Sequence, residues 1–591
     1  MDETKMDSVT LDQLFSRAAD APEVKVHFWK NKNSISSFSY KELQDKALLV
    51  TGKLQKLGVK KGDRVAIVLP TDPTFYHAFF GVIFSGAIAA ALYPPVRLGR
   101  MDEWKERTAA MLKSIGCKAV ITDKKIFNLL GEPVREASPE LGCFTVDELQ
   151  KDNISGNMAK MSSRDLCIIQ FSSGTTGSPK PVALSHHNII RNTHSILSTL
   201  PGDITEHSAV SWLPLYHDMG LVGCLFSTMM AKRDLTLIRP EQFIARPKMW
   251  LEALTKQKAT VSVAPNFAFG LCNSRVSEKD MAELDLSRWK IALCGAEAVH
   301  PNTLKNFSKK FASVGFKETS LSPVYGLAEA TLAVTFSSLE ETPISTVFDR
   351  EQLEIHDKAV LADEGITLAS VGRALPDTEI EIRSSSNKKI DDNAIGRVWV
   401  KSDGIMEEYY LNPEATAEII QDGWLDTGDQ GFIHEDNLYL CGRYKDAIII
   451  RGRNYSAADI EHALEELPGV RQGCAAAFSD YIKEEDDSES LVVLVEYRKQ
   501  QVNNMDELKK QIGERIQLQC NLKAADIVLL EPGTLPRTSS GKIRRNAAKI
   551  QWRRNELYSP GKGGLKTVLK ESIQGVWQHR QAQRERKVKN V

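Results

Sequence analysis

Short apolar runs alternate with stretches of helical periodicity through the first half of the chain. Each run is continuous, as in a strand that is covered on both faces, and the runs lie at residues 65–70, 118–123, 167–171, 260–265 and 290–295. Such strands, separated by helices, are typical of parallel α/β layers and argue against an antiparallel sandwich. The pattern therefore predicts an α/β fold class for this half.

The pattern of polar and apolar residues changes near residue 370. Polar and apolar residues alternate along TEIEIR (378–383), and FIHEDNLYLCG (432–442) contains a plausible turn at Asp436-Asn437. This alternation predicts a smaller β-rich unit.

Beyond about residue 446 the pattern changes again. A helix is expected to start near Ser456, with Asp459 placed as in a capping box, and strand-like runs follow at residues 474–478 and 491–497. This order predicts a compact α+β domain.

The most apolar segment covers residues 78–95. It is interrupted by two glycines and a serine and stops at Pro94-Pro95, which is short for the roughly 20 residues of a membrane-spanning helix. We expect a buried helix followed by a buried strand, and not an integral membrane protein; a membrane span is the alternative.

Composition narrows the class of protein. The chain has 591 residues, with 76 Lys or Arg against 77 Asp or Glu, which excludes a disulfide-stapled peptide or a disordered chain and allows two to four domains. Nine cysteines lack Cys-x-x-Cys spacing and the acidic N-terminal segment lacks the order of a signal peptide, so a cytoplasmic protein is expected.

The last 50 residues, from Lys542 on, are basic, with 14 Lys or Arg against 3 acidic residues. A helix with a frayed tail is the simpler interpretation, and a surface that binds acidic partners, nucleic acid or anionic lipid is the alternative, although the tail has few interleaved aromatic residues. No nucleic-acid partner is expected.

The strongest chemical signal is FSSGTTGSPK (171–180), directly after an apolar strand. Glycines allow close approach of the backbone to phosphate, hydroxyl and amide groups donate to its oxygens, and a lysine supplies charge. The loop is not a Walker A motif, because Ser-Pro-Lys follows Gly177. It predicts a phosphate cradle, with a plain turn as the alternative.

Further motifs follow this loop in a fixed order: YGLAEAT (325–331), DGWLDTGD (422–429), GRYKD (442–446) and PRTSSGKIRR (536–545). With them, residues 35–545 resemble the adenylate-forming ANL superfamily, which includes acyl-CoA ligases and peptide-synthetase adenylation domains. The resemblance implies a large N-terminal domain of two α/β subdomains plus a small β-barrel-like subdomain (1–445), and a small mobile α+β domain with the basic tail (446–591).

A second set of motifs is more specific: SWLPLYHDMGLVG (211–223), RPEQFIARPKMWL (239–251), APNFAFGLC (264–272) and CGAEAV (294–299). These resemble the fatty acyl-AMP ligases, which activate a fatty acid with ATP and Mg²⁺ and usually transfer it to an acyl carrier protein on a separate chain. An insertion at about residues 339–366 is a further mark of that family, in which it is thought to restrain the small domain from the thioester-forming arrangement.

The resemblance assigns roles to individual residues. Lys542 would reach the acyl carboxylate and the α-phosphate, Glu329 would be linked to Mg²⁺, and His217 would border the acyl carboxylate, with a buried structural histidine as its alternative. Asp446 would be the hinge of the small domain, although a loop aspartate that caps a strand is the simpler interpretation.

The remaining assignments concern binding. The β- and γ-phosphates are assigned to Ser172, Ser173, Gly174, Thr175, Thr176, Gly177 and Lys180. The adenine and ribose are assigned to Gly295, Ala296, Tyr325, Gly326, Asp429 and Arg443. A medium or long acyl chain is assigned to a tunnel lined by Trp212, Met219, Phe267 and Phe269.

Two other functions stay open. A fatty acyl-CoA ligase shares the adenylation residues and differs in its acceptor, and a silent domain that binds acyl chains or adenylates would lack Lys542 or Glu329, both of which are present.

One departure from the resemblance is Pro181, which follows the loop lysine where most relatives have glycine and which removes an amide donor.

Overall fold

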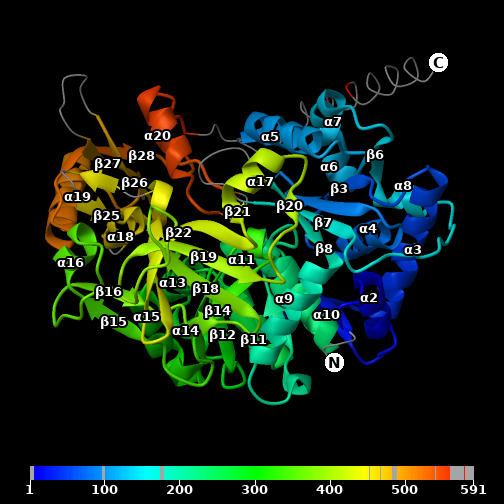
Figure 1. The fold of residues 1–591 in the computed structure, drawn as a ribbon, viewed down its shortest axis with the longest axis horizontal. Coiled ribbons are helices and arrows are strands. Elements are labelled where there is room, and N and C mark those ends of the chain that lie inside the picture. Colours follow the sequence, from blue (N-terminus) through cyan, green and yellow to red (C-terminus); the bar gives the residue numbers. More distant parts are fainter. Residues whose placement is uncertain are drawn as a thin grey trace.

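The computed structural model describes residues 6–95, 100–172, 179–446, 448–450, 453–465, 467–481, 489–538, 541–559, 575 and 578. Its N-terminal part, blue to green in Figure 1, holds two large sheets, and the elements from β24 (Ile448–Ile450) to α20 (Arg545–Arg553), orange to red-orange, lie toward one end of the molecule. We call the segment from Ile448 on the small domain, and the rest the large domain.

The first large sheet is built mainly from parallel strands. In the described residues its order is β20 (Glu408–Tyr409), β8 (Pro181–Ser185), β7 (Leu166–Phe171), β4 (Ile88–Leu92), β3 (Arg64–Val68), β5 (Ala119–Thr122) and β6 (Gly142–Thr145). The pairs from β7 to β6 are parallel, and β8 and β20 are antiparallel additions at one edge.

The second large sheet has the same character. Its described order is β17 (Arg373–Ala374), β14 (Ala333–Phe336), β13 (Leu321–Gly326), β12 (Ile291–Cys294), β11 (Val261–Ala264), β9 (Ala209–Ser211), β10 (Leu235–Ile238), β1 (Lys25–Asn31) and β2 (Ser34–Ser39). Its central pairs are parallel. The five apolar runs correspond to β3, β5, β7, β11 and β12, so the predicted α/β fold class is confirmed.

The most apolar segment is buried in the core that both sheets share. It forms part of α4 (Pro73–Phe84) and then β4, as predicted, and all of β4 is buried. Phe79 and Phe80 pack against Phe226, with ring centroids 6.2 and 6.4 Å apart. Continuous burial explains the apolar composition without a bilayer. Within the described residues, we find no helix with the length and apolar character needed to cross a membrane.

A third sheet is antiparallel and corresponds to the predicted β-rich unit. It comprises β18 (Thr378–Arg383), β19 (Gly396–Ser402), β21 (Ile420–Gln421), β22 (Trp424–His434) and β23 (Asn437–Arg443). The turn predicted at Asp436-Asn437 is wrong by one residue. Because His434 pairs with Asn437, the turn is Glu435-Asp436, and both residues adopt left-handed φ values of 49° and 62°.

The segment predicted as an insertion forms a hairpin with a helix at its tip. It contains β15 (Ser345–Phe348), α16 (Arg350–Ile355) and the start of β16 (Ile366–Ala369). Arg350 Nη2 donates to the carbonyl oxygen of Gln519 in the small domain at 2.9 Å. The hairpin therefore contacts the small domain in this arrangement.

The small domain has an α+β core of its own. Its main elements are α18 (Ala457–Ala463), β26 (Val470–Asp480), β27 (Ser490–Tyr497), α19 (Met505–Cys520), β28 (Ala524–Leu530) and α20 (Arg545–Arg553). Alternate residues of β27 face two layers, with Val493 in the cluster that contains Ile512 of α19, and Val492 in the cluster that contains Ala548 of α20. Ser456 caps α18 by accepting from the Asp459 amide, as predicted.

Candidate active site

A fixed pair of charges lies at the end of the β22–β23 hairpin. Asp429 and Arg443 are cross-strand partners, and Arg443 Nε donates to Asp429 Oδ1 at 3.1 Å. The Tyr325 hydroxyl donates to Asp429 Oδ2 at 2.7 Å. Asp429 raises the pKa of Arg443, which keeps the guanidinium charged. Since each carboxylate oxygen can accept more than one hydrogen bond, Asp429 retains capacity for the hydroxyl groups of a ligand.

The C-terminal ends of the adjacent parallel strands β12 and β13 form the wall beside this pair. Gly295 follows β12 and closes against Val324, where an added Cβ would lie 2.7 Å from a Val324 side-chain carbon and 2.8 Å from its carbonyl oxygen. Ala296 follows with a left-handed φ of 69°. A Cβ at Gly326 would lie 1.7 Å from the Leu332 carbonyl oxygen, so a side chain is excluded there too. Ligands commonly bind at such strand ends in open α/β sheets.

The two ends of the predicted phosphate loop are held together. The Ser172 amide donates to the carbonyl oxygen of Lys180 at 3.0 Å, and the Lys180 amide donates to Ser172 Oγ at 3.4 Å. Pro181 is the first residue of β8, a strand position that tolerates the missing amide donor. Five predicted residues lie outside the described residues: Ser173, Gly174, Thr175, Thr176 and Gly177.

Tyr409 joins the loop lysine to Glu329, and the sequence analysis did not single it out. Its hydroxyl donates to Glu329 Oε1 at 2.7 Å, and Lys180 Nζ lies 4.5 Å from the centre of its ring. Burial and the Glu329 carboxylate raise the Tyr409 pKa, so the hydroxyl stays protonated as a donor. Tyr409 lies on the two-residue strand β20, too short to give a pattern that would have found it.

Lys542 lies on a tight loop of the small domain that faces the large domain. The Thr538 amide donates to the Lys542 carbonyl oxygen at 2.7 Å, and the Lys542 amide donates to Thr538 Oγ1 at 3.0 Å. Gly541 makes the turn with a φ of 93°.

The surroundings of Lys542 are both apolar and charged. Burial and the Arg443 guanidinium lower its pKa, while the carboxylates of Glu297, Asp218 and Asp429 oppose that shift. The ammonium group therefore lies within electrostatic reach of the Asp429–Arg443 pair on the other domain.

Glu297 belongs to the CGAEAV motif but was not singled out. Its Oε1 accepts from the amide of Phe267 at 2.6 Å, at the start of α13 (Asn266–Arg275). Burial raises its pKa from 4.5 to about 7, and Lys542 partly opposes this. Glu297 lines the cavity and is bonded to the backbone of Phe267, one of the predicted acyl residues.

His217 and Asp218 contact each other just before a π-helix (Met219–Phe226). His217 Nδ1 lies 2.5 Å from Asp218 Oδ1, and that oxygen also accepts from the Met219 amide at 2.7 Å. Burial opposes ionisation of Asp218, but His217 holds its pKa below the usual value. His217 is partly exposed and lines the cavity, so it is not an enclosed structural histidine.

Three of the four predicted acyl residues, Trp212, Met219 and Phe267, line the cavity, and we call the part that they line the acyl arm or apolar arm. Trp212 stacks on Phe243 with ring centroids 4.0 Å apart, and Phe267 meets Trp212 edge-on at 5.8 Å. Met219 also lines the arm.

The fourth, Phe269, is not brought to the arm. Its side chain has 0% exposure and packs between Trp250, Trp289 and Phe307. Positions i and i+2 of a helix point to different sides, so Phe267 and Phe269 cannot both face the arm.

Asp446 lies in the short 3-10 turn that joins the two domains. Its Oδ2 accepts from Arg545 Nη1 at 3.2 Å, and the same arginine is paired with Glu461 at 2.7 Å. The predicted hinge residue is therefore anchored to the small domain.

One cavity of about 1910 Å³ connects these groups. Ser172, Lys180, His217, Ala296, Tyr325, Gly326, Glu329, Asp429, Arg443, Asp446 and Lys542 line it, together with the acyl arm. Gly295 supports the wall without lining the cavity. In the described residues, no cluster of three or more His, Cys, Asp or Glu side chains could hold a metal ion.

Comparison with known proteins gives consistent matches. The AMP-binding enzyme family matches residues 14–410, and the AMP-binding enzyme C-terminal domain matches residues 452–547. A 4-hydroxyphenylalkanoate adenylyltransferase of Mycobacterium tuberculosis is 32% identical over 87% of this chain and 86% of its own. A long-chain-fatty-acid–AMP ligase of Mycobacterium bovis is 31% identical over 88% and 92%. A solved structure from work on fatty acyl-adenylate ligases of E. coli and L. pneumophila is 33% identical, covers 94% of this chain and 99% of its own, and has a TM-score of 0.86.

Proposed function

The chain belongs to the family of AMP-binding enzymes. We propose that it converts a medium- or long-chain fatty acid and ATP into acyl-AMP and pyrophosphate. In a second step it would transfer the acyl group to an acyl carrier protein. The observation that carries the proposal is the meeting, in one cavity, of Lys542, the Asp429–Arg443 pair and an apolar arm. The names of the M. bovis relative and of the solved structure support a fatty acid as substrate.

Adenylation must bring two anions together, because the substrate carboxylate attacks the α-phosphate of ATP. Catalysis is then mainly positioning and neutralisation of charge. Lys542 is the group proposed to touch both reactants. One ammonium–phosphate contact at ~4 Å provides roughly 4 kcal/mol at an effective dielectric near 20. Asp429 and Arg443 would hold the ribose, and the wall from Ala296 to Tyr325 would hold the adenine.

Mg²⁺ fits the residues around Glu329. Tyr409 occupies Oε1 of this carboxylate, and within the described residues no side chain bonds to Oε2. Mg²⁺ is usually held by one or two carboxylates together with substrate phosphates, so a single glutamate without a protein cage is compatible with it. When bound, the ion would neutralise phosphate charge, while the hydrogen bond from Tyr409 holds the Glu329 carboxylate in place.

The apolar arm supports a long acyl chain. At about 0.8 kcal/mol per buried methylene, shortening the chain by four carbons would cost ~3 kcal/mol, or roughly a hundredfold in affinity. Acetate would therefore be a poor substrate.

The insertion supports a carrier protein over coenzyme A as acceptor. The small domain must turn about Asp446 to present a different face for acyl transfer, and the contact from Arg350 to Gln519 holds it in the present arrangement.

Asp446→Pro should impair transfer more than adenylation, because Lys542 already faces the cavity before the domain turns.

Product analysis tests the proposal. The protein is incubated with ATP, Mg²⁺, radiolabelled dodecanoate and excess coenzyme A, and a parallel sample contains a 4-hydroxyphenyl-substituted alkanoate. Acyl-AMP without acyl-CoA is expected. Efficient acyl-CoA formation would make the protein a fatty acyl-CoA ligase, and no adenylate from either acid would contradict the proposal.

A further inference from the structure

Three arginines gather where α5 (Met101–Ser114) meets the small domain. Arg100 precedes α5, Arg107 lies on it, and Arg544 comes from the small domain, two residues after Lys542. We call these three residues the arginine cluster. It is separate from the nucleotide, metal and acyl groups described above.

Glu103 is the carboxylate that ties the cluster together in the described residues. Its Oε2 accepts from Arg100 Nη1 at 3.2 Å, and its Oε1 accepts from Arg544 Nη1 at 3.0 Å. Arg100 Nη2 also donates to the carbonyl oxygen of Gly533 at 3.4 Å. The cluster therefore bridges the large and small domains.

The charges in the cluster do not balance. Glu103 pairs with two of the three guanidinium groups, and within the described residues the Nε atoms of both Arg100 and Arg544 are buried without a hydrogen-bond partner. Burial lowers the pKa of Arg544, and the nearby Arg107 and Arg100 lower it further. Buried positive charge that is only partly paired is costly, so an anion would complete this site.

The large-domain part of the cluster follows a strand that neighbours the strand before the phosphate loop. Strand β4, which leads to α5, pairs in parallel with β7, which leads to the phosphate loop, so both segments leave the same edge of the sheet. Arg100 and Arg107 line the same cavity as Ser172 and Lys180. In an in-line displacement, pyrophosphate leaves on the side opposite the attacking carboxylate, which is the side of the phosphate loop.

We propose that the arginine cluster is a second anion site, beyond the phosphate loop, that binds pyrophosphate as it leaves. This inference rests on the proposed adenylation reaction. Because Arg544 belongs to the small domain, the site is complete only while the domains are arranged as here. Bound pyrophosphate would therefore stabilise this arrangement, and its release would free the small domain to turn.

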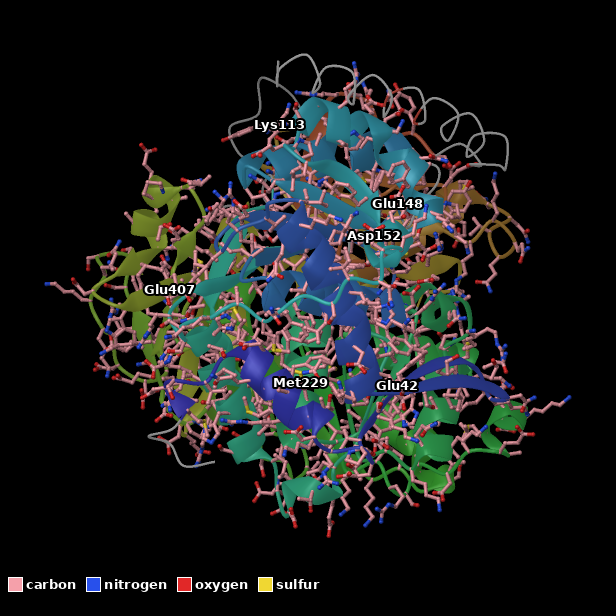
Figure 2. All side chains as sticks on the ribbon, turned by 90° about the vertical axis from the view of Figure 1, so that its right-hand side faces the viewer. Glu42, Lys113, Glu148, Asp152, Met229 and Glu407 are labelled. Carbon is pink, nitrogen blue, oxygen red and sulfur yellow. The ribbon has the colours of Figure 1, made fainter. Side chains whose placement is uncertain are left out.

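Titration calorimetry with inorganic pyrophosphate tests the site without turnover or a fatty acid. The variants of the full-length protein are R107Q and R544Q, at constant ionic strength. The control is K113Q, which removes the same charge from the same helix; Lys113 is exposed, pairs with Glu136, and lies at the periphery in Figure 2. Binding of AMP by each variant reports that the nucleotide site is folded.

R107Q and R544Q are each expected to weaken pyrophosphate binding about tenfold or more, as for loss of a charge-assisted contact, while K113Q binds like the wild type and AMP binding is unchanged. Wild-type affinity in R107Q, or equal wild-type affinity for inorganic phosphate and pyrophosphate, would overturn the assignment. These outcomes do not depend on which acid is adenylated. If the protein forms acyl-AMP, pyrophosphate should also inhibit R107Q less than the wild type.

Discussion

The nucleotide end and the acyl end of the cavity differ in how strictly each restricts the amino-acid sequence. At the nucleotide end, the groups are polar and each is fixed by specific partners, as Asp429 is by Arg443 and Tyr325. At the acyl end, one face of an aromatic-rich helix lines the arm while another face, with Phe269, belongs to the core. Polar chemistry restricts residue type and spacing, whereas an apolar lining requires only shape, which packing decides.

The sharpest test of the acyl end compares two phenylalanines on α13. F269A should destabilise the protein by about 3–5 kcal/mol, because it opens a cavity among Trp250, Trp289 and Phe307, and it should leave the preference for acyl chain length unchanged. F267A should shift chain-length preference at a much smaller cost in stability. Denaturant unfolding measures the stability, and assays with a series of fatty acids measure the chain-length preference. If F269A and F267A changed both quantities alike, the assignment of Phe269 to the core and Phe267 to the arm would be wrong.

The same contrast explains how far the sequence could be interpreted. The strand runs, the α4–β4 segment and the cap at Ser456 were predictable because local periodicity determines them. Tyr409 was not, because its role depends on β20 pairing with β8, far away in sequence. The turn at Glu435-Asp436 was missed by one residue, since hairpin register is set by pairing across the strands.

At the nucleotide end, the largest effect is expected from Lys542. K542A should reduce acyl-AMP formation by at least about 10² to 10³, as for loss of one transition-state contact, while AMP still binds. Lys509, exposed on α19, provides the control variant K509A. Quenched-flow measurement of acyl-AMP from dodecanoate is the assay, and near-normal rates in K542A would remove Lys542 from the mechanism.

A smaller effect is expected from Tyr409. Y409F removes the hydrogen bond to Glu329 and keeps the ring under Lys180, so it should raise the Mg²⁺ concentration needed for half-maximal adenylation by about tenfold. Y410F alters the neighbouring tyrosine, whose ring centre lies 5.8 Å from the Arg64 guanidinium carbon, and serves as the control. An unchanged Mg²⁺ dependence in Y409F would limit Tyr409 to packing.

The smallest effect concerns pH and Glu297. The folded-state pKa of about 7 lies above the ordinary value of 4.5, so Glu297 favours the folded state at low pH, and this contribution is lost as pH rises from about 4.5 to about 7. E297Q stays neutral and can still accept from the Phe267 amide. The Tm of E297Q minus the Tm of the wild type should therefore be larger at pH 8 than at pH 5. The same Tm difference at both pH values would mean that Glu297 does not titrate between them.

The two-layered core around β27 has a consequence for how the molecule comes apart. Among the described residues, the clusters packed on the two faces of β27 share no member with the large-domain core. The small-domain clusters and the large-domain core can each melt as a cooperative unit, and the two units are joined by contacts such as the hydrogen bond from Arg350 to Gln519. A calorimetric scan should then resolve two heat-absorption peaks, and a non-hydrolysable acyl-adenylate that touches both units should draw those peaks together.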